Sequence, residues 1–202
     1  MRLIIISTII IHLFFGCTRD SKTTDNQASQ IDDSTLGNNL IMADFLMYAD
    51  SLKIDSLTDQ VTKSFDIYDD RNNKILHVDA EELAEFQFDF FLPRLNIILN
   101  KRNFNLEVKT ADNYETSNEV FLNGEKTQLY TKAELENSDF WDKASRTFFK
   151  KLNELLKKKS INESFFLLYN GNDLHALLLT DKQFNIIADK LKNEPKEMPY
   201  RP

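Results

Sequence analysis

The sequence has a single cysteine, four glycines and four prolines among 202 residues. One cysteine cannot form an intramolecular disulfide, and it cannot build the multi-cysteine sites that hold structural zinc. The sequence also lacks a Gly-x-Gly-x-x-Gly motif, a P-loop and a Gly-x-Ser-x-Gly motif, which are common signatures of nucleotide binding and nucleophilic catalysis. The domain must therefore rely on its hydrophobic core, to which sixteen phenylalanines contribute.

Basic residues are outnumbered by acidic ones, 25 to 32, and the net charge is −7. Affinity for nucleic acid comes largely from Lys and Arg that neutralise phosphates, so we expect no nucleic-acid partner. An acidic surface instead favours association with a basic protein, because opposite charges steer the encounter.

A short apolar run opens the chain. Arg2 precedes 13 mostly apolar residues, Leu3–Phe15, which end at Gly16-Cys17. A membrane-spanning helix needs about 20 apolar residues, whereas a secretory signal has a shorter core and ends at a small residue. We therefore expect residues 1–16 to be a signal peptide that is removed on export.

The end of this run, Leu13–Cys17, resembles the lipobox of bacterial lipoproteins. Gly16 and Cys17 match that pattern, while Phe14 stands where leucine is usual. The resemblance covers the first 17 residues and implies that Cys17 receives diacylglycerol and a further acyl chain such as palmitate. It implies a protein anchored to a membrane of the cell envelope, such as the outer membrane, facing the periplasm or the cell surface. A plain signal peptide and a retained signal anchor remain the alternatives.

The rest of the chain divides by composition. Residues 17–35 contain the lipidated cysteine and a polar segment too poor in apolar residues to fold, so we interpret them as a flexible tether. Residues 36–192 have enough apolar content for a single domain. Three prolines in residues 193–202 indicate an extended tail.

The periodicity of the domain predicts an α+β fold, with an antiparallel or mixed sheet built from hairpins and covered by three to four helices. Predicted helices cover residues 38–53, 79–101 with a kink at Pro93, a short segment after Thr131, 139–158 and a segment after Thr180. Predicted hairpins join 65–68 to 75–78, 120–122 to 128–130 and 165–169 to 174–180, and a further strand covers 104–108.

The helix 139–158 carries its large apolar residues on one face. We expect Trp141, Phe148 and Leu152 to pack against the sheet that contains the 165–180 hairpin, because both strands of that hairpin are apolar on both faces.

Two histidines, His77 and His175, follow the signal segment. Zinc usually takes three or four protein ligands, so we interpret both as polar residues of strands and expect neither a metal site nor a cofactor. The polar run Asp66–Asn73 lacks the glycine of a calcium-binding loop and is typical of a turn.

Two charged clusters have structural interpretations as well. The acidic cluster Glu81, Glu82 and Glu85 suits the positive end of a helix. The lysines at 150, 151 and 157–159 are typical of a solvated helix end, with a patch for an acidic partner as the alternative.

Together these features predict a lipid-anchored protein of the cell envelope that binds another protein and is not an enzyme. An envelope accessory factor or a toxin-immunity protein would fit this description. The alternative is an envelope hydrolase that uses His175 or His77 with nearby carboxylates. The site residue we predict is Cys17, as the position of the lipid through which the protein contacts the membrane.

Overall fold

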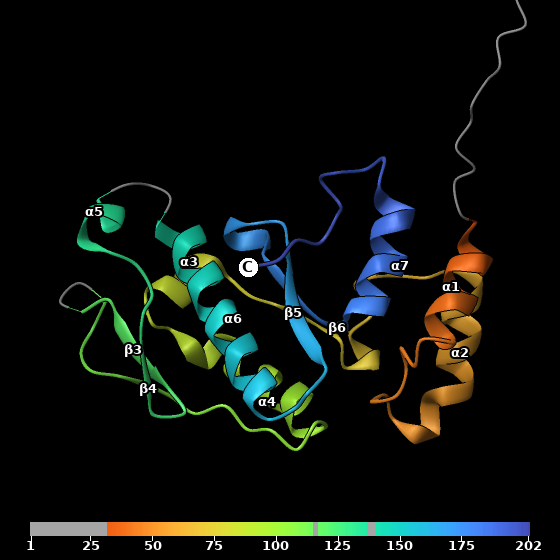
Figure 1. Cartoon of the computed structure of the whole chain (residues 1–202), viewed down its shortest axis with the longest axis horizontal. Coiled ribbons are helices and arrows are strands. Elements are labelled where there is room, and N and C mark those ends of the chain that lie inside the picture. The colour runs from red at the N-terminus through yellow and green to blue at the C-terminus, as the bar shows by residue number, and fades with distance from the viewer. Residues whose placement is uncertain (1–31, 115–116, 137–139) are drawn as a thin grey trace, which may run out of the picture. The chain divides into compact units, whose positions relative to one another are not determined.

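A computed structural model of the chain describes residues 32–114, 117–136 and 140–202. Cys17 and the signal segment lie outside the described residues. In the described part, seven α-helices and two three-stranded antiparallel sheets confirm the predicted α+β class (Figure 1).

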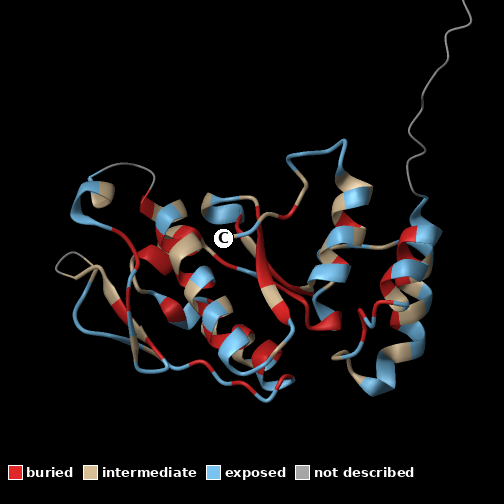
Figure 2. Cartoon of the chain, viewed as in Figure 1, coloured by how far each residue is buried: buried red, intermediate tan, exposed pale blue. Residues whose placement is uncertain are grey.

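The central sheet has the strand order β1-β6-β5, with every pair antiparallel. Its strands are β1 (Ile75–His77), β6 (His175–Thr180) and β5 (Glu163–Leu168). The hairpin of β5 and β6 is confirmed, and both of its strands are largely buried (Figure 2). Because side chains alternate along a strand, each strand supplies apolar residues to both faces of the sheet.

The small sheet has the order β2-β3-β4 and consists of β2 (Val108–Thr110), β3 (Glu119–Leu122) and β4 (Glu125–Gln128). Asn123 and Gly124 both have positive φ, +48° and +80°, as the predicted two-residue hairpin turn requires. This tight turn starts the second strand at residue 125, three residues earlier than we predicted.

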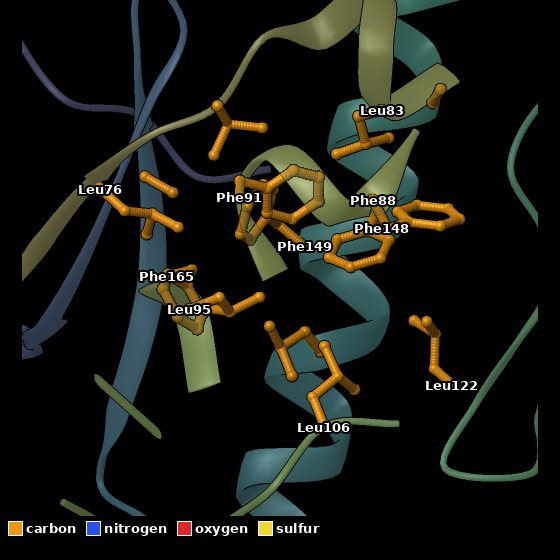
Figure 3. Close-up of a cluster of buried hydrophobic side chains, with 14 of the residues drawn as sticks. Leu76, Leu83, Phe88, Phe91, Leu95, Leu106, Leu122, Phe148, Phe149 and Phe165 are labelled. Carbon is orange, nitrogen blue, oxygen red and sulfur yellow. The ribbon is translucent and has the colours of Figure 1, made fainter. Parts of the chain in front are cut away.

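One face of the central sheet is covered by α3 (Ala80–Ala84), α4 (Leu92–Asn100) and α6 (Phe140–Lys158). The predicted packing of α6 is confirmed: Phe148 and Leu152 are fully buried in the same cluster as the inward residues of β5, and Trp141 packs at its edge. Phe149 lies between α6 and the sheet, with its ring 5.2 Å from that of Phe165 (Figure 3).

The opposite face is covered by α1 (Asp33–Ile41), α2 (Ile54–Lys63) and α7 (Asp181–Leu191), which enclose a second apolar cluster with residues of β5 and β6. A further short helix, α5 (Lys132–Leu135), begins at a capping box formed by Thr131, and α7 begins at another formed by Thr180. Both capping boxes were predicted, and both satisfy backbone N–H groups at a helix start.

The predicted helix over 79–101 is wrong as a continuous element. Asp79 caps its start as expected, but the chain leaves the helix after Ala84, where Phe86 adopts φ of +62°. A 3₁₀ turn, η3 (Phe88–Phe90), precedes α4, so Pro93 lies in the first turn of a new helix. The break allows Phe88 to reach the core beside Phe148.

The predicted strand at 65–68 is also wrong. The carboxylate of Asp66 accepts the N–H of Tyr68, so this segment forms a turn, and a 3₁₀ turn, η2 (Asp70–Asn72), follows it. Strand β1 therefore has no hairpin partner before it and pairs with β6. The predicted strand 104–108 is an irregular segment that leads into β2.

The ends of the domain also differ from the prediction. Asp32 caps α1 through the N–H of Thr35, so the helix starts at residue 33 and not at 38. It ends at Ile41, and turns follow up to the 3₁₀ segment η1 (Ser51–Lys53). In the predicted tail, Tyr200 pairs with Leu167 at the outer edge of β5.

Candidate functional site

The two histidines that are separate in the sequence are neighbours in the central sheet. His77 of β1 lies directly opposite His175 of β6. The next pair of opposite residues, Val78 and Leu174, is hydrogen-bonded, since the N–H of Val78 donates to the Leu174 carbonyl at 2.8 Å. Hydrogen-bonded and non-hydrogen-bonded pairs alternate, so the histidines form a non-hydrogen-bonded pair, in which side chains lie closer together. Their ring centroids are 5.1 Å apart.

Each imidazole is held by a backbone carbonyl of the β5–β6 turn. His77 Nε2 lies 2.7 Å from the Asn172 oxygen, and His175 Nδ1 lies 2.8 Å from the Asp173 oxygen. A carbonyl only accepts, so both of these nitrogens carry a proton. Burial lowers the pKa of His175, and the nearby His77 contributes to the lowering. In the described part of the chain, neither ring is hydrogen-bonded to a carboxylate.

Aromatic rings flank the pair on both sides. Tyr68 packs edge-on against His175 at 5.4 Å, and Phe90 packs edge-on against His77 at 5.7 Å. Tyr68 is 44% exposed and Phe90 is 54% exposed, although both are large and largely apolar. The rings of Tyr68, His175, His77 and Phe90 therefore lie side by side at the end of the sheet. These four residues are called the aromatic surface below.

Two clefts of the described part are lined by residues of the histidine pair. The first has a volume of about 630 Å³ and is lined by Tyr68, His175, Tyr169 and Tyr200 among others. The second has a volume of about 370 Å³ and is lined by residues of β1 and the α4 region, including Phe90 and Arg94. Tyr68 and His175 line both clefts, so they separate one from the other.

The tyrosines of the first cleft are held in place by hydrogen bonds. The Tyr169 hydroxyl donates to the Glu197 carboxylate and lies 2.6 Å from the Tyr68 hydroxyl. These two hydrogen bonds, Glu197 first, raise the pKa of Tyr169 above its usual range. The Arg146 guanidinium stacks over the ring of Tyr200 at 4.4 Å. The side chains of the cleft wall are therefore joined to one another by hydrogen bonds and ring contacts.

The two edge strands of the central sheet, β5 and β1, differ in whether their outward main-chain groups are hydrogen-bonded. On the outer edge of β5, the Asn153 side chain bonds both the N–H and the carbonyl of Phe165, at 2.6 and 3.0 Å. The backbone of Tyr200 bonds both groups of Leu167, at 2.8 Å each. The outer edge of β5 is thus covered.

On β1, the main-chain groups of Ile75 and His77 point away from β6, because both belong to non-hydrogen-bonded pairs. The preceding outward carbonyl, that of Asn73, accepts from Arg102 at 3.1 Å. Within the described ranges, no residue bonds to the outward groups of Ile75 and His77. Ile75 is only 2% exposed, so His77 is the residue of this edge that is exposed to solvent, and both residues help to line the second cleft.

The other sequence candidates take structural roles. Asp69 accepts the N–H of Arg71 and pairs with its guanidinium, as expected of turn residues. The described residues contain no group of three or more His, Cys, Asp or Glu side chains that could hold a metal ion. Lys151 and Lys158 both bond Glu125 of the small sheet and lower its pKa to about 2.

Sequence reasoning missed a buried network of charged residues. The Glu163 carboxylate accepts from Arg102 at 2.7 and 3.0 Å and pairs with Lys74, and all three side chains are almost fully buried. Lys74 also donates to Gln183 at 3.1 Å. The sequence contained one indication of this network, because Lys74 and Glu163 each stand at the start of a run of residues that forms a buried strand.

Comparison of the chain with models of protein families, with curated proteins and with solved structures finds no match. Of the helices in the described ranges, none has the length and apolar character needed to cross a membrane.

Proposed function

We propose that the chain is a lipid-anchored protein of the cell envelope that binds a partner protein at the aromatic surface and catalyses no reaction. The observation that carries the proposal is the exposure of Tyr68 and Phe90 on either side of the histidine pair. Aromatic residues and arginine dominate the binding energy of protein interfaces, and Arg94 and Arg146 line the adjoining clefts.

The unpaired main-chain groups at the exposed end of β1, at His77, support an extended segment as the part of the partner that binds. An extended peptide can add to an unpaired strand, with main-chain hydrogen bonds for affinity and side-chain pockets for specificity. His77 offers the unpaired main-chain groups, and the second cleft beside it offers a pocket for a side chain. The net charge of −7 favours a basic partner, whose association rate falls as salt rises.

Membrane anchoring in this proposal rests on the lipobox-like segment that ends at Cys17. Two or more acyl chains give stable anchoring where one is marginal. A Cys17→Ala chain, expressed in a bacterium with metabolically labelled fatty acid, should carry no acyl label and leave the membrane fraction. An unchanged membrane fraction would reject the lipoprotein interpretation.

The partner proposal is tested by capture from an envelope extract with the full chain, at low and high salt. Phe90→Ala and Tyr68→Ala should each weaken capture of the same protein by about fivefold or more, because interface hot spots cost over about 1 kcal/mol. The matched control is Ile97→Ala, since Ile97 lies on α4, is 51% exposed and lines neither cleft.

Capture that all three variants retain equally would place the binding surface elsewhere. The enzyme alternative has a separate test, a His77→Ala, His175→Ala double variant incubated with cell-wall material. The observation that favours this second candidate is the position of both histidines beside clefts that also contain Asp70, Asp173 and Glu197. Turnover by the wild type that the double variant lacks would replace the binding proposal.

A further inference from the structure

The histidine pair has the hydrogen bonding of metal ligands. A histidine that binds a metal usually donates its second ring N–H to a carbonyl or carboxylate, which fixes the tautomer and the ring orientation. The carbonyls of Asn172 and Asp173 take this role here. The remaining nitrogens, His77 Nδ1 and His175 Nε2, carry lone pairs, and no residue in the described ranges hydrogen-bonds to them.

The spacing of the rings suits a shared ion. Two nitrogens on one metal, each at about 2 Å, can lie at most about 4 Å apart. Ring centroids 5.1 Å apart permit such a separation, because the nitrogens lie on the rims of the rings. The cross-strand pairing fixes the two Cα atoms, and the packing of Phe90 and Tyr68 limits how far the rings can turn away.

The site is accessible to an ion from solvent. His77 is exposed and His175 is half-buried, and both line the second cleft.

We propose that His77 and His175 together bind one divalent transition-metal ion, through His77 Nδ1 and His175 Nε2. Imidazole suits copper, nickel and zinc, and the general order of affinity places copper first. Because the chain supplies two ligands, water or a side chain of a bound protein completes the coordination. Both proposed ligands belong to the chain itself, so metal binding is tested separately from the protein-binding proposal.

The test is calorimetric titration of the full chain in detergent with Cu²⁺ and, separately, with Zn²⁺. His12 of the signal segment is replaced by alanine in every sample, so that His77 and His175 are the only histidines. We expect one Cu²⁺ per chain, bound more tightly than Zn²⁺, with two nitrogen ligands in the electron paramagnetic resonance spectrum. Affinity should fall steeply as the pH drops below the histidine range.

His77→Ala and His175→Asn should each weaken Cu²⁺ binding more than tenfold, because each removes a ligand. Asp70→Asn is the matched control, since Asp70 lines the same cleft and should change affinity by less than threefold. Circular dichroism of each variant checks that the fold is retained. No uptake at tenfold molar excess of metal, or uptake that a double histidine variant retains, would overturn the proposal.

Discussion

Lys74, Arg102 and Glu163 form one buried network of charges. We expect substitutions of Glu163 and of Lys74 to have very different effects on the free energy of unfolding. Glu163 is the single acidic member between two cations, and all three side chains are shielded from solvent. Replacing Glu163 by glutamine removes the only negative charge and leaves two cations facing a neutral amide. We therefore expect Glu163→Gln to be among the most destabilising substitutions in the domain.

The magnitude follows from the cost of an unpaired buried charge. Breaking a buried ion pair by removing one partner costs about 3–5 kcal/mol, whereas a domain has about 5–15 kcal/mol of unfolding free energy in total. The second partner behaves differently. In Lys74→Met, Glu163 keeps both hydrogen bonds from Arg102, and Gln183 keeps the N–H of Thr180 at 3.2 Å.

Lys74→Met should therefore cost less than about 1.5 kcal/mol, or stabilise the fold, because it leaves one anion with one cation and keeps a similar side-chain volume. Urea unfolding followed by the fluorescence of Trp141, the single tryptophan, measures both variants. A loss for Lys74→Met as large as that for Glu163→Gln would refute the reasoning that Glu163 is balanced by Arg102.

The pH dependence of unfolding gives an independent check. Burial lowers the pKa of Lys74 from 10.5 to about 8, against the favourable charge of Glu163. Between these two values the unfolded chain binds more protons at Lys74 than the folded chain. The contribution of Lys74 should thus raise the unfolding free energy by up to about 1.4 kcal/mol per pH unit between pH 8 and pH 10.5. The difference between wild type and Lys74→Met should show this slope, and equal slopes would contradict it.

Two further substitutions test the packing on the two faces of the central sheet. Phe148→Ala should cost about 3–5 kcal/mol in urea unfolding, because the ring is fully buried between Phe88 and Phe91, and a loss below about 1 kcal/mol would reject the packing. Gly37→Ala should destabilise by about 1–3 kcal/mol, since a Cβ there would lie 2.0 Å from the Val61 oxygen. A gain in thermal midpoint, the usual effect of alanine in a helix, would contradict the close approach of α1 and α2.

Local signals in the sequence predicted those parts of the fold that depend on neighbouring residues. Asn123-Gly124 specified a hairpin turn, and Thr131 and Thr180 specified helix starts, because each motif satisfies backbone groups within a few residues. The buried face of α6 could also be predicted, because an amphipathic helix of 19 residues repeats its apolar pattern over several turns.

Predictions failed where distant contacts overrode local preference. Helix-forming residues from Ala80 onwards favoured one long helix, but the core requires Phe88 to turn toward Phe148, and the positive φ of Phe86 provides that turn. The contact between the two histidines could not be predicted from the sequence either. His77 and His175 meet only because β1 pairs with β6, and no residue near either one in the sequence indicates this pairing.

The buried network also satisfies a main-chain group next to strand β1. Ile75 and His77 present main-chain atoms away from β6, and Asn73 ends the 3₁₀ turn just before this strand. Arg102, held by Glu163, occupies the carbonyl of Asn73. Ile75 is buried as well, so the proposed added strand would hydrogen-bond at His77, beside the histidine pair. The same guanidinium thus both balances the charge of Glu163 and satisfies the main-chain carbonyl next to β1.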